Sequence, residues 1–413
     1  MTQRRLSVLH VIPGLGITTG GPAQAVVGLG RALHRQGHEV AIYTTDLVGP
    51  AAGWGRPRRG PEPAVMARRL RAEGIDVRVF PIGWPSRYAY APQLGRALRR
   101  EVGQFDLLHI HSMYLYPTWA AANACRQAGV PYILRPLGTL TAYQVRRSRR
   151  TKQIYDSMLG RGVVAGASLL HFTSEQEKSD TEANGYAGPS RVVRLGISTE
   201  TFRDLPPRGR FRARHPAIGA RPVVLFLGRL TPKKGLDLLI PAFASVRESC
   251  PNAHLVLAGP DENGYAGTIQ RLVERHGLTH CVTFTGPLAG EEKLAALRDA
   301  DAWALPSYAE NFGVAVVEAM AAGLPVVISD QVDIHPQVAA AEAGVVVPCA
   351  MEPLARALRR LLEEPHERQR LGLRARELAL TRFSWDAVAA DVQAMYQDAL
   401  HHTRPSIQSI ERP

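Results

Sequence analysis

Residues 301–330 constrain the fold more than any other stretch of the sequence. They read DAWALPSYAENFGVAVVEAMAAGLPVVISD, with an apolar run at 302–306, a polar loop at 307–311, an apolar segment with helical spacing, and a second apolar run at 325–329. This order predicts a strand, a loop, a helix and a second strand in a parallel crossover unit. We therefore expect an α/β fold built on mostly parallel sheets.

Two carboxylates frame the loop of this unit. Glu310 lies in the loop and Glu318 lies within the predicted helix. In a parallel crossover unit the loop after the first strand lies at the carboxyl edge of the sheet, and the next helix directs its free amides toward the ligand. Amides bind phosphate, and carboxylates accept hydrogen bonds from hydroxyls. The pattern predicts a site for a nucleotide sugar, which carries both kinds of group.

The spacing of these carboxylates resembles a family motif. Glu310 and Glu318, with seven residues between them, resemble the E-x7-E motif of retaining glycosyltransferases of the GT4 type (glycosyltransferase group 1), whose fold is called GT-B. The resemblance implies that Glu310 and the amides of Asn311, Phe312 and Gly313 hold the donor hexose, and that Glu318 holds the ribose. Two other interpretations remain open, namely a helix cap at Glu310 and a solvated helix position at Glu318.

A second stretch of the same kind begins at residue 222. Its sequence, VVLFLGRLTPKKGLDLLIPAF, predicts a strand, a turn and a helix, and it resembles the start of the donor domain of the family. The resemblance implies that Gly228, Arg229 and Lys234 contact the diphosphate, with the guanidinium as a planar fork and the ammonium as a point charge. Two of the five lysines of the chain occur in this loop. Gly259, at the end of the next predicted strand, belongs to the same expected site.

The amino-terminal half opens with a strand at 6–12 and a glycine-rich turn. The spacing does not match a dinucleotide-binding fingerprint, because Thr19 stands where the third glycine is required. The pair Gly20 and Gly21 instead resembles the glycine-rich loop of GT-B enzymes, which faces the donor phosphates. Pro22 then begins a helix.

Histidines on the next buried strand give candidates for the acceptor side. His109 and His111 alternate within the strand predicted at 105–111, so they lie on one face of it. His111 ends the strand and is predicted to be a site residue, whereas His109 is predicted to pack in the core. The following strand ends at Arg135. Many relatives carry a histidine where this chain has Leu137, so we expect His111, Arg135 and Leu137 to line the acceptor side.

The length of 413 residues predicts two domains of about 200 residues each. By resemblance they are Rossmann-like domains facing across a cleft, and residues 47–74, rich in proline and arginine, are expected to be a mobile excursion. The predicted division is an acceptor-side domain at 1–200 with a last helix at about 384–402, a linker at 201–221, a donor domain at 222–383 and a tail at 403–413.

The net charge of +13 comes almost wholly from arginine and predicts affinity for polyanions. The densest cluster, at residues 146–152, is expected either to attach the protein to an anionic membrane surface or to be a solvated helix flank. No apolar run reaches the roughly 18 residues of a membrane span. Asp299 and Asp301 form a D-x-D sequence, but they precede a strand, so we expect no metal there, and the four cysteines lack metal spacing.

The function implied by the resemblance is transfer of a hexose from a nucleotide diphosphate sugar to a hydroxyl acceptor, with retained configuration. Arg229, Lys234, Glu310 and His111 are the expected catalytic residues, without metal or cofactor. The expected acceptor is a lipid-linked or polysaccharide intermediate, and the expected location is the cytoplasm or the inner face of the membrane. Two rivals are a nucleotide-sugar epimerase of the same fold and a polyanion-binding protein, although nucleic-acid binding is disfavoured because no basic motif is interleaved with aromatics.

Overall fold

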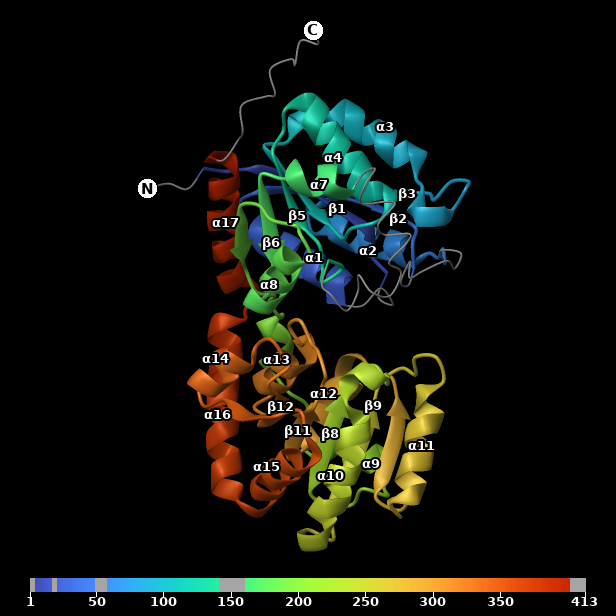
Figure 1. Ribbon diagram of the computed structural model, residues 1–413, viewed down its shortest axis with the longest axis vertical. Coiled ribbons are helices and arrows are strands. Elements are labelled where there is room, and N and C mark those ends of the chain that lie inside the picture. Colours follow the sequence, from blue (N-terminus) through green and yellow to red (C-terminus); the bar gives the residue numbers. More distant parts are fainter. Residues whose placement is uncertain (1–3, 17–20, 49–57, 141–159, 402–413) are drawn as a thin grey trace. The chain divides into compact units, whose positions relative to one another are not determined.

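The computed structural model describes residues 4–16, 21–48, 58–140 and 160–401. The chain forms two compact units, one comprising residues 1–196 and 385–413 and the other residues 197–384 (Figure 1). Residues 201–221, predicted to be a linker, fall inside the second unit and contain α9 (Arg210–Arg214). Among the described residues, no helix is long and apolar enough to span a membrane.

The first unit is built on a parallel sheet. Its order among the described residues is β3-β2-β1-β4-β5-β6-β7, which begins with the strand order of a Rossmann fold. The order reverses between β1 and β4, where His10 pairs in register with His109. The strands are β1 (Ser7–Gly14), β2 (Glu39–Thr45), β3 (Asp76–Phe80), β4 (Leu107–His111), β5 (Tyr132–Arg135), β6 (Leu169–Phe172) and β7 (Ser190–Val192).

Helices cover both faces of this sheet. Leu9 and Leu108 pack with α3 and α4 in one buried cluster, whereas His109, next to Leu108 and so on the opposite face, bonds Tyr396 of α17. The helices are α1 (Gly21–Arg35), α2 (Glu62–Ala72), α3 (Pro92–Glu101), α4 (Tyr116–Ala128), α7 (Arg161–Ala165), α8 (Glu175–Ala183) and α17 (Trp385–His401), with short 3-10 turns at Arg87–Ala89 and Val102–Gln104.

The helix α2 corrects one expectation. Residues 47–74 were predicted to be a mobile excursion because of their prolines. Residues 49–57 lie outside the described residues, but α2 occupies Glu62–Ala72 and buries Ala67 and Leu70. Pro63 lies in the first turn, where a missing amide hydrogen removes no helical hydrogen bond. The composition was therefore misread, since proline at the start of a helix favours the helix.

The second unit repeats the same plan. Its sheet order among the described residues is β10-β9-β8-β11-β12-β13, again with parallel pairing and a reversal of order, here between β8 and β11. The strands are β8 (Val223–Leu227), β9 (His254–Ala258), β10 (Val282–Gly286), β11 (Ala302–Leu305), β12 (Val326–Ser329) and β13 (Gly344–Val347). The prediction of an α/β fold with two mostly parallel sheets is confirmed.

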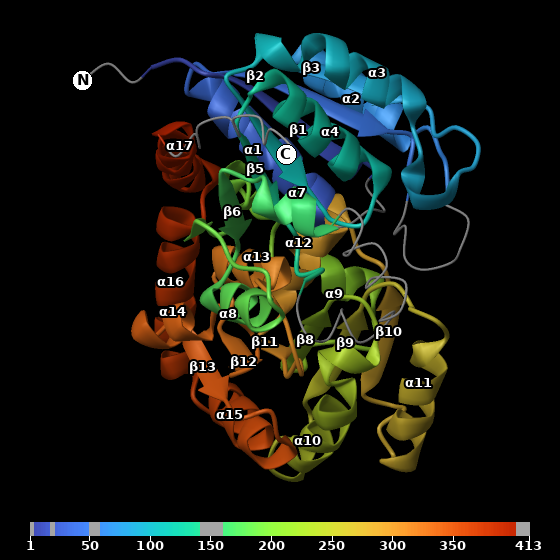
Figure 2. The same cartoon turned by 45° about the horizontal axis from the view of Figure 1, so that its top comes forward.

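The helices of the second unit flank this sheet, and α10 and α15 lie side by side (Figure 2). They are α9, α10 (Leu236–Ser249), α11 (Tyr265–Arg275), α12 (Gly290–Asp299), α13 (Val314–Ala321), α14 (His335–Ala340), α15 (Met351–Glu363) and α16 (Pro365–Arg382), with 3-10 turns at Thr199–Phe202 and Pro232–Lys234. The crossover unit predicted at 301–330 is present as β11, α13 and β12, and β11 pairs in parallel with β12.

Candidate functional site

The expected donor residues of the second unit meet at one edge of its sheet. Gly228 follows β8, Gly259 follows β9 and Glu310 lies in the loop after β11. All three strands are parallel, so these loops leave the same, carboxyl, edge. The strand order reverses between β8 and β11, and ligands of doubly wound sheets bind at such a reversal. The sequence therefore placed these residues at the correct edge.

Two glycines let the loops approach closely. Gly259 has φ +150°, and a Cβ atom there would lie 1.8 Å from the carbonyl oxygen of Gly228. Gly235, with φ +69°, is pressed against the carbonyl oxygen of Pro306, which a Cβ would approach to 1.9 Å. Real Cβ atoms do not approach backbone oxygens so closely, so a side chain at either position would push the loops apart.

Lys234 and Glu310 are in direct contact within these loops. Lys234 Nζ donates a hydrogen bond to Glu310 Oε2. The loop that carries Lys234 is anchored to the loop after β11, since Ser307 Oγ and the Tyr308 amide both donate to the carbonyl of Lys233 at 2.9 Å. The interpretation of Glu310 as a helix cap is wrong, because the α13 N-cap is Gly313 and it receives no side-chain cap.

The charges near this contact act on the pKa of Glu310. Burial alone would raise the pKa of Glu310, but the charge and hydrogen bond of Lys234, with Lys233 and Arg229 nearby, hold it below its usual value. Burial lowers the pKa of Lys233, and the negative charge of Glu310 opposes that shift. Glu310 is therefore a carboxylate at neutral pH. It is able to accept hydrogen bonds from hydroxyl groups.

The start of α13 offers amides to the same place. Gly313, in a left-handed conformation (φ 72°), precedes the first helical residue, and the amides of Val314 and Ala315 have no acceptor among the described residues. Phe312 is buried with its ring centroid 5.6 Å from that of Phe383, so it offers the site only its backbone. Asn311 lies between Glu310 and Phe312 and is half-buried.

Two other residues of the expected donor site, Glu318 and Arg229, are each paired with an opposite charge. Lys293 Nζ of α12 donates to Glu318 Oε1 at 2.7 Å, and Arg229 NH1 donates to Glu262 Oε2 at 2.7 Å. The Glu318 side chain is 15% exposed, so the interpretation of a solvated helix position is wrong. Arg229 is 63% exposed and accessible to a ligand from solvent.

Four histidines of the first unit, His10, His109, His111 and His171, form a buried layer rather than an open edge. His109 is fully buried, as predicted, and His111 is fully buried as well. His171 Nε2 donates to the Val193 carbonyl at 2.9 Å, so its Nδ1 accepts from His109 Nε2 at 3.1 Å, and His109 Nδ1 accepts from the Tyr396 hydroxyl at 3.0 Å. This series of hydrogen bonds places one ring proton on Nε2 of His171 and one on Nε2 of His109, so both imidazoles are neutral.

The pair His10 and His111 is not fully satisfied. His10 Nδ1 lies 3.0 Å from His111 Nε2, while His10 Nε2 and His111 Nδ1 are buried without a partner in the described part of the chain. Whichever nitrogen donates, two neutral imidazoles leave one buried N–H and one buried lone pair unmatched. The role of His111 in the site stays a prediction, because no part of its side chain is exposed.

Arg135 lies beside this layer at the end of β5, in register with His111. Arg135 is 2% exposed, and burial lowers its pKa to about 10 while the charge of Glu177 opposes that shift. Glu177 also accepts from the Gly138 amide at 2.6 Å and so fixes the loop containing Leu137, which is half-buried with φ 59°. Gly21 begins α1, and Gly20 lies outside the described residues.

Comparison with known proteins identifies the family. The model "Glycosyl transferases group 1" matches residues 207–378, and "Glycosyl transferase 4-like domain" matches residues 20–197. The D-inositol 3-phosphate glycosyltransferase of Corynebacterium glutamicum is 30% identical over 94% of each chain. The chain belongs to the group 1 glycosyltransferases.

Other matches of this group 1 glycosyltransferase extend over nearly the whole chain. The MMP alpha-(1->4)-mannosyltransferase of Mycolicibacterium hassiacum is 26% identical over 92% of this chain and 95% of its own. Anabaena Alr3699/HepE, crystallised with UDP and glucose, superposes with a TM-score of 0.73 at 19% identity, covering 95% of this chain and all of its own. That structural likeness supports the GT-B fold.

Sequence reasoning missed two partners in the second unit of this glycosyltransferase. Lys293 bonds Glu318 from α12, and Glu262 bonds Arg229 from the loop after β9. One signal was available for Lys293, because lysine is rare in a chain whose cations are mostly arginine. No local signal marked Glu262, since the pair joins residues 33 positions apart.

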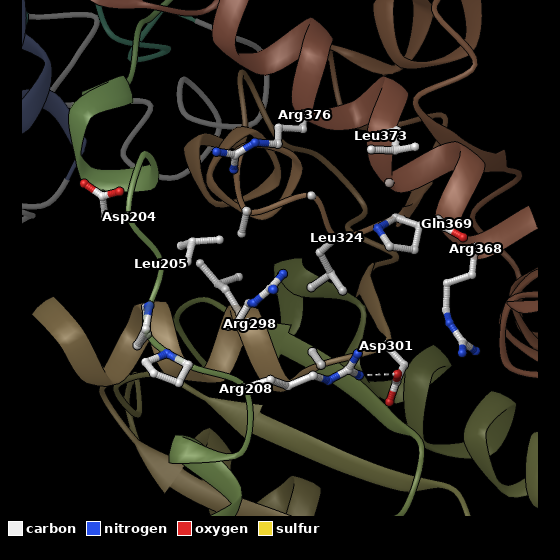
Figure 3. Close-up of a pocket in the computed structure, with 18 of the residues that line it drawn as sticks. Asp204, Leu205, Arg208, Arg298, Asp301, Leu324, Arg368, Gln369, Leu373 and Arg376 are labelled. Carbon is white, nitrogen blue, oxygen red and sulfur yellow. Dashed lines mark hydrogen bonds and ion pairs between the residues drawn. The ribbon is translucent and has the colours of Figure 1, made fainter. Parts of the chain in front are cut away.

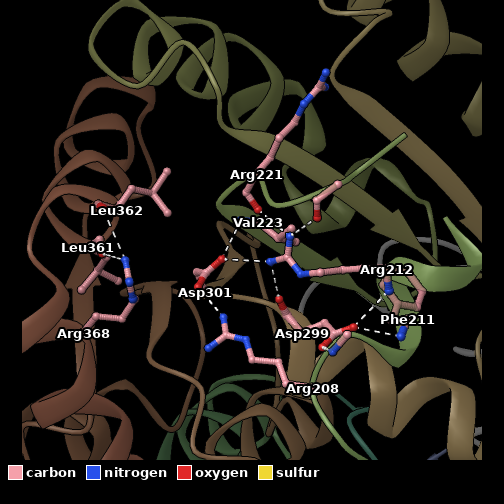
Figure 4. Close-up of polar contacts among 12 residues, drawn as sticks. Arg208, Phe211, Arg212, Arg221, Val223, Asp299, Asp301, Leu361, Leu362 and Arg368 are labelled. Atoms are coloured by element: carbon pink, nitrogen blue, oxygen red, sulfur yellow. Dashed lines mark hydrogen bonds and ion pairs between the residues drawn. The ribbon is translucent and has the colours of Figure 1, made fainter. Parts of the chain in front are cut away.

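The D-x-D carboxylates, Asp299 and Asp301, hold segments of the second unit together through hydrogen bonds (Figure 4). Asp299 accepts from the amides of Phe211 and Arg212 at 2.8 and 3.0 Å, and Asp301 accepts from Arg208 at 2.7 Å and from the Val223 amide at 2.9 Å. They precede β11 at its amino edge, as predicted. These bonds also explain why the predicted linker folds with the second unit.

One set of described side chains has the spacing for a metal ion. His10, His109 and His111 bring ligand atoms within 4.8 Å of one another. Both nitrogens of His109 already bond Tyr396 and His171, and the nearby Arg135 disfavours added positive charge. We therefore interpret the three histidines as a packing layer. Metal-independent transfer stays a prediction.

Proposed function

We propose that this glycosyltransferase moves a hexose from a nucleotide diphosphate sugar to a hydroxyl acceptor with retained configuration. The observation that carries the proposal is the contact between Lys234 and Glu310, beside the free amides at the start of α13. A cation and helix amides suit the diphosphate, and a carboxylate suits sugar hydroxyls. The likeness to a protein crystallised with UDP and glucose supports the same class of donor.

The charge pairs present without ligand suggest how each residue changes its partner when the donor binds. The diphosphate attracts Lys234 away from Glu310, which frees the carboxylate for the hexose hydroxyls. Arg229 exchanges Glu262 for phosphate oxygens in the same way. Lys293 holds Glu318 by one oxygen and leaves the other oxygen for the ribose. In this exchange Lys234 and Arg229 gain phosphate oxygens as partners, and Glu310 keeps hydrogen-bond donors in the hexose hydroxyls.

The proposed chemistry needs no side-chain nucleophile. The bond between the anomeric carbon and the phosphate oxygen breaks, and the acceptor oxygen bonds to the same face of that carbon. The acceptor proton passes to the departing phosphate. Arg229, Lys234 and the amides near Gly313 stabilise the negative charge that develops on the leaving diphosphate, which is electrostatic catalysis without a metal.

The acceptor side is proposed to be in the first unit, near Arg135, His111 and Leu137. A lipid-linked or polysaccharide intermediate is the proposed acceptor, with transfer in the cytoplasm or at the inner face of the membrane. The basic cluster at 146–152, on which membrane attachment depends, lies outside the described residues. A soluble inositol phosphate is the second candidate acceptor, because a relative 30% identical over 94% of each chain is named for that substrate.

The test is a screen of nucleotide sugars for slow donor hydrolysis, followed by transfer to candidate acceptors. The anomeric configuration of the product is read by NMR. We expect one donor to be hydrolysed, the product to retain the donor configuration, and Glu310→Gln to reduce both reactions. Release of an epimerised sugar without acceptor would establish the epimerase instead. Binding of no nucleotide sugar at all would contradict the proposal.

A further inference from the structure

A pocket of about 870 Å³ lies within the second unit, away from the donor loops (Figure 3). Its walls are residues 203–208, the end of α12, the turn after α13 and one face of α16. Asp301, Leu324 and Pro325 line it, and they precede β11 and β12, whereas the donor residues follow their strands. The pocket is therefore at the opposite edge of the sheet. Its volume is in the range of small-molecule sites.

Positive charge gathers in this pocket, which we call the arginine pocket. Five arginines and two aspartates line it, so three positive charges are unmatched within it. The arginines are Arg203, Arg208, Arg298, Arg368 and Arg376, and the aspartates are Asp204 and Asp301.

Three of the arginines are held in place by the fold. Arg208 donates to Asp301 at 2.7 Å, Arg368 donates to the carbonyl of Leu361 at 3.0 Å, and Arg376 donates to the carbonyl of Phe202 at 2.8 Å. Carbonyl groups carry no net charge, so the charges of Arg368 and Arg376 are not neutralised. Asp301 is also shared with Arg212, which further reduces its effect on the pocket.

The other two arginines are unpaired. Arg203 and Arg298 are exposed, and neither side chain has a hydrogen bond or ion pair among the described residues. Arg298 extends from α12 toward the middle of the pocket (Figure 3). Like charges gathered on two facing walls repel one another unless an anion lies between them.

The first turns of helix α16 also line the arginine pocket. It has 18 residues, and Pro365, Arg368 and Gln369 in its first turns line the pocket. Its positive dipole end lies at the pocket wall, as do the negative carboxyl-terminal ends of α12 and α13, so the positive charge of the pocket comes from its arginines. Leu205, Leu324 and Leu373 supply apolar surface beside the cations. A ligand with both charged and uncharged parts fits this combination.

We propose that the arginine pocket binds a small phosphorylated molecule carrying two or more negative charges. Guanidinium groups bind phosphate through two parallel hydrogen bonds, and five arginines line this pocket. The apolar wall takes the rest of the molecule. This site goes beyond the proposed transfer reaction and does not depend on it, because none of its residues belongs to the donor site.

The test is calorimetric titration with inorganic pyrophosphate at physiological salt, without nucleotide sugar. Pyrophosphate also fits the donor loops, so the titrations use an Arg229→Ala/Lys234→Ala background. We expect binding to persist in that background and to weaken at least tenfold when Arg203→Gln/Arg298→Gln is added. Both residues are exposed and unpaired, so the substitutions leave the fold intact.

The matched control is Arg271→Gln/Arg275→Gln, which removes two exposed arginines from α11 of the same unit. We expect pyrophosphate affinity to be unchanged in this control. Equal weakening in the control would show a general effect of net charge and overturn the proposal. Loss of all binding in the Arg229→Ala/Lys234→Ala background would overturn it as well, by assigning pyrophosphate to the donor loops alone.

Discussion

Lys293 Nζ lies 2.7 Å from Glu318 Oε1, so a lysine of α12 fixes one oxygen of a carboxylate in α13. The two helices are consecutive along the chain, separated by β11. The pair orients Glu318 before any donor binds. A pre-oriented acceptor loses less conformational freedom when it bonds a ligand hydroxyl. Glu318 is therefore the residue on which we expect donor affinity to depend most directly.

The first prediction is that Glu318→Gln weakens donor binding by about 1 to 3 kcal/mol, the scale of a hydrogen bond to a charged group. The amide keeps the shape of the side chain but removes its charge. Calorimetry with the donor found in the screen measures the effect. Glu274→Gln, an exposed position on α11, is the control and should leave affinity unchanged. Unchanged affinity in Glu318→Gln would remove Glu318 from the site.

The second prediction concerns the cations after β8. Lys234→Ala and Arg229→Ala should each lower kcat by roughly 10², because their charges act mainly when the diphosphate leaves. Steady-state kinetics distinguishes this from simple binding, since a rise in KM alone would indicate equal stabilisation of substrate and transition state. Arg271→Ala is the control. Activity should also survive a metal chelator, and its loss would contradict metal-independent transfer.

The third prediction is structural. Gly259→Ala should destabilise the second unit by about 3 kcal/mol, because the new Cβ would lie 1.8 Å from the carbonyl oxygen of Gly228. Gly267→Ala within α11 is the control, where the added methyl meets only Arg271 at 3.7 Å and alanine favours the helix. Urea unfolding measures both. Equal stability of the two variants would show that the loops after β8 and β9 can separate without cost.

The donor loops could be predicted because their positions follow from local rules. The period of apolar residues gives β11, α13 and β12, and parallel pairing places Glu310 at the carboxyl edge. Lys293 and Glu262 could not be predicted, since their pairing depends on packing between separate elements. His111 shows the same limit. Its place at the end of β4 was correct, but its burial beside His10 depends on the three-dimensional packing of the unit.

The last prediction follows from the buried histidine layer. Burial, with the charge of Arg135 beside it, lowers the pKa of His10 and of His171 to about 3, and burial with neighbouring charges lowers those of His109 and His111 well below the usual value. All four are neutral in the folded protein near pH 7. In the unfolded chain a histidine takes up a proton below about pH 6.5.

Stability should therefore fall as the pH falls through 6.5, because the unfolded state then binds more protons than the folded state. At pH 5, which is 1.5 units below 6.5, each such histidine lowers the free energy of unfolding by about 2 kcal/mol, since one unit corresponds to about 1.4 kcal/mol. The loss should continue toward pH 3, where His10 and His171 begin to be protonated in the folded protein. Urea unfolding at pH 7 and at pH 5 measures this loss of stability, with a spectroscopic signal that reports on the first unit.

The comparison of variants isolates one histidine. His10→Asn removes one titrating group, so its loss of stability between pH 7 and pH 5 should be about 2 kcal/mol smaller than that of the wild type, whatever its stability at pH 7. His276→Asn, at an exposed position in the second unit, should keep the wild-type loss. Imidazole proton resonances give a direct check. A midpoint above pH 6 for any of the four buried histidines in the folded protein would show that the layer accepts charge and is not a neutral core.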